Sequence, residues 1–86
     1  MLWQRNNDWT GSEIEDSFVM VNIESGKFVA LNVTATAVWD ALAEPCSAGD
    51  IVDRLQRRFD VAPAECASAV DALLLQMRER SMVVPV

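Results

Sequence analysis

The sequence predicts an α+β fold in which a three-stranded antiparallel sheet is followed by three helices. Residues 10–31 contain short β-branched and apolar runs separated by turn residues, a pattern typical of strands. Beyond residue 32 the apolar side chains recur at helical spacing. Because a chain of 86 residues can build only one small core, we interpret residues 1–86 as one domain, with residues 1–8 as a flexible N-terminal tail.

The three predicted strands occupy residues 10–15, 18–23 and 27–31. The first alternates in polarity and should be half-exposed. Residues 18–23 are apolar at nearly every position, which predicts a central strand covered on both faces. The turn at residues 24–26 closes a tight hairpin, because Gly26 is free to adopt the left-handed conformation. The third strand therefore runs back antiparallel to the second.

Two short helices are expected next. Asn32 and Thr34 are candidate caps for the first, which runs to about residue 43. Pro45 interrupts the chain, and Ser47 with Asp50 three residues later resembles a capping box that opens the second helix. The predicted buried stripes are Ala35, Val38, Trp39 and Leu42 in the first helix, and Ile51, Leu55 and Phe59 in the second.

The third helix should be the longest. It begins at Pro63, whose missing N–H costs nothing at a first helical position. One face is a wide apolar stripe for the core, made of Cys66, Val70, Leu73 and Met77. The neighbouring shoulder of the helix is edged with charge and is expected to line a groove; it consists of Ala67, Asp71, Leu74 and Arg78. Residues 81–86 are expected to lie as a short extended tail against the sheet.

The third strand is predicted to have an open edge. Most proteins protect a sheet edge with prolines or inward-pointing charges, and residues 28–31 carry neither. If the long helix lies beside that edge, the two elements form a groove to which an extended peptide can add as one more strand. The same edge would allow two copies of the chain to pair as a homodimer. The predicted function is therefore peptide binding.

Composition argues against several other classes of function. The net charge of −6 opposes binding to nucleic acid and favours a peptide that carries positive charge. No apolar run approaches the roughly 20 residues of a membrane-spanning helix, and the N-terminus is not a signal peptide, so we expect a cytoplasmic protein with no membrane partner. The chain has no histidine, and Cys46 and Cys66 stand alone. We expect no metal, no cofactor and no catalytic residue.

The order of strands and helices is that of a winged helix-turn-helix, a fold that often binds DNA through a recognition helix. The third helix is poorly charged for that role, because three carboxylates oppose its two arginines. A winged-helix transcription regulator or protein-interaction module is the alternative function, and an accessory subunit of an enzyme is a third. Their candidate contact surface is the arginine face of the second helix, Arg54, Arg57 and Arg58.

The segment from the second strand to the first helix resembles the PqqD-like family, the RiPP recognition elements. The matching residues are Val19-x-Val21-Asn22-x-Glu24-Ser25-Gly26-Lys27-Phe28-x-Ala30-Leu31-Asn32-x-Thr34-Ala35, then Val38-Trp39, Phe59-Asp60-Val61 and Pro63. The resemblance covers about residues 14–83. Two positions differ from the family pattern: Ala62 replaces an acidic cap and Ser81 replaces a glycine.

The resemblance implies a role in making ribosomally synthesised, post-translationally modified peptides, lasso peptides among them. Members of the family bind the leader of a precursor peptide as a strand added along the third strand, in the cleft against the third helix. They deliver it to a modifying enzyme such as a protease, a cyclase or a radical enzyme. The implied peptide-binding residues are Lys27, Phe28, Val29, Ala30, Leu31 and Asn32 on the strand, and Ala67, Val70, Asp71, Leu74 and Arg78 on the helix.

Overall fold

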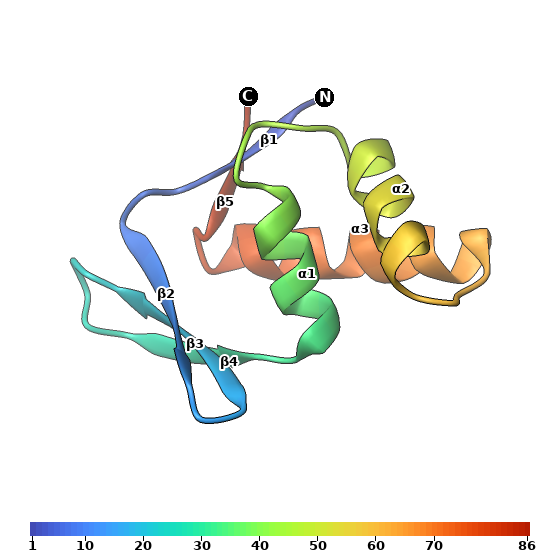
Figure 1. Ribbon diagram of the computed structural model, residues 1–86. Helices are drawn as coiled ribbons and strands as arrows, with labels where there is room; N and C mark the ends of the chain where they lie inside the picture. Colours follow the sequence, from blue (N-terminus) through green and yellow to red (C-terminus); the bar gives the residue numbers. More distant parts are fainter.

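The computed structural model describes all 86 residues and has the predicted α+β architecture, with a three-stranded antiparallel sheet and three helices (Figure 1). A further short strand lies at each end of the chain. In chain order the elements are β1 Trp3–Arg5, β2 Trp9–Ile14, β3 Ser17–Asn22, β4 Phe28–Leu31, α1 Val33–Ala41, α2 Ala48–Arg58, α3 Pro63–Glu79 and β5 Val83–Pro85.

The larger sheet has the strand order β2-β3-β4, so β3 is central and β4 is an edge strand, as predicted. Met20 of β3 lies opposite Gly11 on one side and Val29 on the other, and it is completely buried. The β3–β4 hairpin turns at Gly26, which has a φ of 75°. The side chain of Asn22 supports this turn by accepting hydrogen bonds from two backbone N–H groups, those of Glu24 and Ser25.

The second face of β3 differs from the prediction. The sequence predicts a central strand covered on both faces, but the protein covers only the face that carries Met20. On the opposite face the side chains of Val21, Ile23 and Phe28 are 37%, 71% and 74% exposed. The physical reason is that the helices pack on one side of the sheet, which leaves an apolar outer face in contact with solvent (Figure 1).

Helix ends follow the predicted capping chemistry. The Asn32 side chain accepts a hydrogen bond from the Ala35 N–H at 2.8 Å and caps α1. Ser47 and Asp50 form a reciprocal capping box at the start of α2. Ala62 precedes α3 and offers no side-chain cap, although Pro63 occupies the first turn. Polar caps therefore fix where α1 and α2 begin.

Both chain ends are structured, which corrects two predictions. Instead of a tail over residues 1–8, Trp3–Arg5 forms β1, and it pairs antiparallel with β5 rather than leaving residues 81–86 against the larger sheet. Trp3 also exchanges backbone hydrogen bonds with Cys46, at 2.8 and 3.1 Å. The reason lies in two indoles, because Trp3 and Trp9 are 9% and 6% exposed and their large apolar rings join the core.

The core lies between the inner face of the sheet and the three helices. α3 crosses behind α1 and packs along α2 (Figure 1). Val38 of α1, Ile51 of α2 and Val70 of α3 are completely buried at this junction. No helix is both long enough and apolar enough to cross a membrane.

A candidate peptide-binding groove between β4 and α3

The open edge of β4 presents backbone groups in a defined alternation. The Asn22 N–H donates to the Lys27 carbonyl at 2.8 Å, which makes these residues a hydrogen-bonded pair. Hydrogen-bonded and non-hydrogen-bonded pairs alternate along antiparallel strands, so Val29 bonds back to β3 at Met20. The N–H and C=O groups of Phe28 and Ala30 therefore point away from β3, toward the open edge.

A groove runs beside this edge, between β4 and the C-terminal half of α3. It consists of two adjoining pockets, and Val29 and Arg80 line both of them. We call the first the apolar pocket; its volume is about 160 Å³. Seven of its ten lining residues are hydrophobic: Val29, Ala30, Leu31, Ala35, Leu73, Met77 and Met82, alongside Asn32, Gln76 and Arg80.

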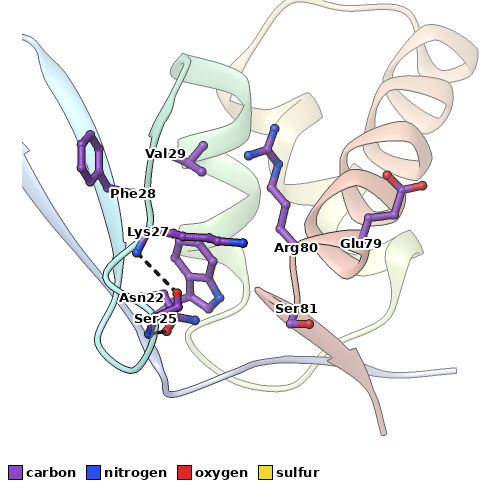
Figure 2. Close-up of a pocket in the computed structure, with 9 residues that line it drawn as sticks. Asn22, Ser25, Lys27, Phe28, Val29, Glu79, Arg80 and Ser81 are labelled. Carbon is purple, nitrogen blue, oxygen red and sulfur yellow. Dashed lines mark hydrogen bonds between the residues drawn. The ribbon is translucent and has the colours of Figure 1, made fainter.

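The second pocket lies at the Lys27 end of β4 and is larger, about 550 Å³ (Figure 2). We call it the polar pocket, because only three of its nine lining residues are hydrophobic. They are Trp9, Asn22, Ser25, Lys27, Phe28, Val29, Glu79, Arg80 and Ser81. The groove thus offers apolar contacts at one end and charged groups at the other.

The six predicted strand residues all line this groove. Lys27 and Phe28 lie at the polar pocket, Val29 at both pockets, and residues 30–32 at the apolar pocket. Along β4 the side chains alternate, so Val29 and Leu31 are half-buried beneath the groove whereas Phe28 and Ala30 are exposed. The structure therefore brings these six residues together along one side of the groove, and their contact with a peptide stays a prediction.

The five predicted helix residues lie elsewhere. Val70 and Leu74 are 0% and 2% exposed, within the core. The Arg78 guanidinium sits 5.9 Å from the centroid of the Trp3 ring, next to β1. Ala67 and Asp71 line neither pocket of the groove. The prediction placed the groove on the wrong shoulder of the helix.

The α3 residues that line the groove are Leu73, Gln76, Met77 and Glu79, followed by Arg80 at the C-cap. The error arose because Leu73 was assigned to the core and Leu74 to the groove. The buried stripe of α3 is Cys66, Val70, Leu74 and Met77, spaced four, four and three residues apart. The predicted stripe, with Leu73 in place of Leu74, is spaced four, three and four residues apart and fits a helix equally well, so the spacing alone does not identify which leucine is buried.

The arginines of α2 are partly engaged within the protein. Arg54 donates to the Ala41 carbonyl at 3.3 Å, and Arg58 lies 3.9 Å from the Asp40 carboxylate. Nearby, Arg5 donates to the Trp39 carbonyl and stacks 4.5 Å from the Trp39 ring. Burial lowers the pKa of Arg5, and the Asp40 charge opposes that shift. These contacts connect β1 and α2 to α1.

Metal-ligating side chains do not gather into a cluster. No three histidine, cysteine, aspartate or glutamate side chains lie close enough to hold an ion. Cys46 and Cys66 are both buried, and each Sγ approaches a backbone carbonyl. The β4/α3 groove combines open backbone groups with an apolar and a polar pocket, an arrangement suited to strand pairing and side-chain fit.

These features define a small recognition domain with an open-edged sheet beside a long helix, and sequence comparison assigns its family. A family model described as "Coenzyme PQQ synthesis protein D (PqqD)" matches residues 17–83. The chain therefore belongs to the PqqD family. No curated protein sequence matches the chain.

Two solved structures share this fold over nearly their whole length. The first is described as "TbiB1 in Complex with the TbiA(beta) Leader Peptide", with a TM-score of 0.84, 16% identity, and 96% of each chain covered. The second is "Lasso peptide synthetase B1 complexed with the leader peptide", with a TM-score of 0.83 and 20% identity over 96% of this chain and 98% of the other. At such identities the likeness concerns the fold.

Proposed function

We propose that this protein binds the leader segment of a ribosomally synthesised precursor peptide by strand addition to β4, and presents it to a modifying enzyme. The observation that carries the proposal is the open edge of β4, where the backbone groups of Phe28 and Ala30 point into a groove closed by α3. Family membership and the two leader-peptide complexes of the same fold support it.

Strand addition explains how a groove of this kind achieves both affinity and selectivity. Backbone hydrogen bonds to Phe28 and Ala30 accept any extended peptide, because they depend little on side-chain identity. Every second peptide side chain then points toward α3, where the apolar pocket beneath Leu73 and Met77 selects by size and hydrophobicity. The remaining side chains point toward the exposed outer face.

The modifying enzyme of the same biosynthetic route is the expected recipient of the peptide. A protease, a cyclase or a radical enzyme would act on the part of the precursor that extends beyond the groove. Binding a peptide along β4 leaves α2 and the outer face of the sheet uncovered. Those surfaces are free to contact the recipient, and the products would be modified peptides such as lasso peptides.

The proposal is tested by fluorescence anisotropy with labelled leader segments of short precursors encoded beside the gene. We expect saturable binding at micromolar concentration or tighter. Leu73→Glu should weaken it, because a buried charge would enter the apolar pocket. Retention of duplex DNA at physiological salt, with no binding of any neighbouring leader, would instead establish a winged-helix regulator.

Proline substitution tests strand addition directly. Ala30→Pro removes an N–H that faces the groove, and prolines are tolerated at the free side of an edge strand. We therefore expect a folded variant that no longer binds the leader. Glu13→Pro is the matched control, because the register places its N–H at the opposite open edge, on β2. Equal binding by both variants would locate the peptide elsewhere.

A further inference from the structure

The polar pocket contains two cationic side chains without an anionic partner. Lys27 reaches from the start of β4, and Arg80 reaches from the end of α3, into the same gap (Figure 2). Neither forms a salt bridge, since the protein's one salt bridge joins Arg58 and Asp40. Two like charges therefore face one hollow from opposite walls.

One acidic residue also lines this pocket, but it does not neutralise the pair. The carboxylate of Glu79 points away from Lys27 and Arg80 (Figure 2). Asn22 is also occupied, because its side-chain oxygen accepts the Glu24 and Ser25 N–H groups of the hairpin turn. The open polar groups of the pocket are thus predominantly hydrogen-bond donors.

Trp9 forms part of the wall of the same pocket, and it also lines a separate pocket beside Arg5 and Trp39. Its side chain lines the pocket and is 6% exposed. The indole Nε1–H is buried and has no acceptor within the protein, the single side-chain donor in that situation. Because this N–H is shielded from solvent, the cationic donors that the pocket offers to a ligand are those of Lys27 and Arg80.

We propose that the polar pocket binds the carboxylate of an aspartate or glutamate side chain of the bound peptide. The inference rests on the proposed leader binding and specifies the chemistry that the leader must carry. It replaces the expectation, drawn from the net charge of −6, of a positively charged peptide. The charges that line the pocket determine which ligand it prefers, because exposed charges more than about 10 Å away are screened at ordinary salt.

The two pockets also set the spacing of the recognised residues. Side chains that point to one face of a strand are separated by an even number of positions. The apolar pocket is lined by Val29 and Leu31, and the polar pocket by Lys27 and Val29. A peptide strand that fills both should carry its acidic and its apolar residue two or four positions apart.

A double-mutant cycle tests this inference. Each Asp or Glu of a binding leader is changed singly to Asn or Gln, in C-terminally amidated peptides that lack a terminal carboxylate. Arg80→Gln should weaken binding of the unaltered leader about two- to fivefold, the range of an exposed ion pair. With the one leader that lacks the recognised carboxylate, the same substitution should have no further effect.

Lys27→Gln should behave in the same way, and Arg57→Gln provides the matched control. Arg57 is exposed on α2, outside the groove. Binding should also weaken with added salt in the wild-type protein more than in Arg80→Gln. If Arg80→Gln and Lys27→Gln bind every leader as the Arg57→Gln control does, the carboxylate site is wrong while leader binding stands. If no leader binds the wild-type protein, the proposed function itself is wrong.

Discussion

Position 11 of β2 requires a glycine, because the Phe18 ring lies directly over it. A Cβ placed at Gly11 would lie 2.4 Å from two ring atoms of Phe18 and 2.8 Å from the sulfur of Met20. We predict that Gly11→Ala lowers the free energy of unfolding by about 1–3 kcal/mol, since the ring and the buried sulfur must shift to avoid overpacking. Urea denaturation would measure the change.

Gly49→Ala is the control for this prediction. Gly49 lies in the first turns of α2, and an added Cβ would meet only the Ser47 Oγ, at 3.7 Å. Alanine has the higher helix propensity, so stability should rise by up to about 1 kcal/mol. Equal effects of the two substitutions would show that the Phe18 contact is not the cause.

The buried thiol of Cys46 should make stability depend on alkaline pH. Burial raises the pKa of Cys46, with Arg54 partly opposing the shift. The folded protein therefore favours the neutral thiol, so this contribution is complete below the ordinary thiol pKa of about 8.5 and is lost as the pH rises through the raised value. Unfolding titrations between pH 7 and 10 should show a steeper decline for the wild type than for Cys46→Ala.

At the residue scale, the sequence identified the strand side of the groove and missed the helix side. Residues 27–32 were predictable because a hairpin turn and a helix cap bracket them in the chain. Predicting the helix side required deciding which of Leu73 and Leu74 faces the core, because successive side chains on a helix point about 100° apart. Both are leucines, so only the packing of α3 against the other elements distinguishes them.

At the scale of elements, α3 ends in a Schellman motif that contains an unfavourable residue. The Met82 N–H donates to the Met77 carbonyl at 2.8 Å, and the Ser81 N–H donates to the Arg78 carbonyl at 3.0 Å. This places Ser81 in the left-handed region, with a φ of 58°. A side chain there costs roughly 1 kcal/mol that glycine avoids.

We therefore predict that Ser81→Gly raises the free energy of unfolding by about 1 kcal/mol. The midpoint of urea denaturation should rise without a change in slope. Ser68→Gly is the matched control, because Ser68 is an exposed residue within α3, where glycine should lower stability by about 0.5 kcal/mol. A decrease for Ser81→Gly would contradict the role of the left-handed conformation.

The order and type of the main elements were predictable for a local reason. Turn and capping residues such as Gly26, Asn32 and Ser47 act within four residues of their own position, and each marks the boundary predicted for it. The exposure of the outer face of β3 was not predictable. Apolar residues on both faces of a strand indicate that both faces are suited to burial, but they do not specify whether another element packs against each face.

At the scale of the whole molecule, β1 closes the fold by pairing with β5 across more than 75 residues of sequence. Its main contribution to the core is Trp3, which is buried, pairs with Cys46 and packs near Arg78. We predict that Trp3→Ala costs about 3–5 kcal/mol, a large part of the stability of a small domain. Chemical denaturation should show the loss.

Trp3→Phe provides the comparison, because it keeps most of the apolar contact and should cost less than Trp3→Ala. An unchanged midpoint for Trp3→Ala would mean that residues 1–8 form a tail after all. No local pattern predicts β1, since its three residues carry a single large apolar side chain and find their partner only at the other end of the chain.

The pairing of β1 with β5 also determines how the domain can be joined to other proteins. Trp3 and Pro85 are register partners, so the chain enters and leaves the fold at neighbouring positions, away from the β2–β3 hairpin (Figure 1). Adjacent strands lie about 5 Å apart. The whole domain therefore has the geometry of a cassette, with both points of attachment side by side, that could be inserted into a single surface loop of another protein.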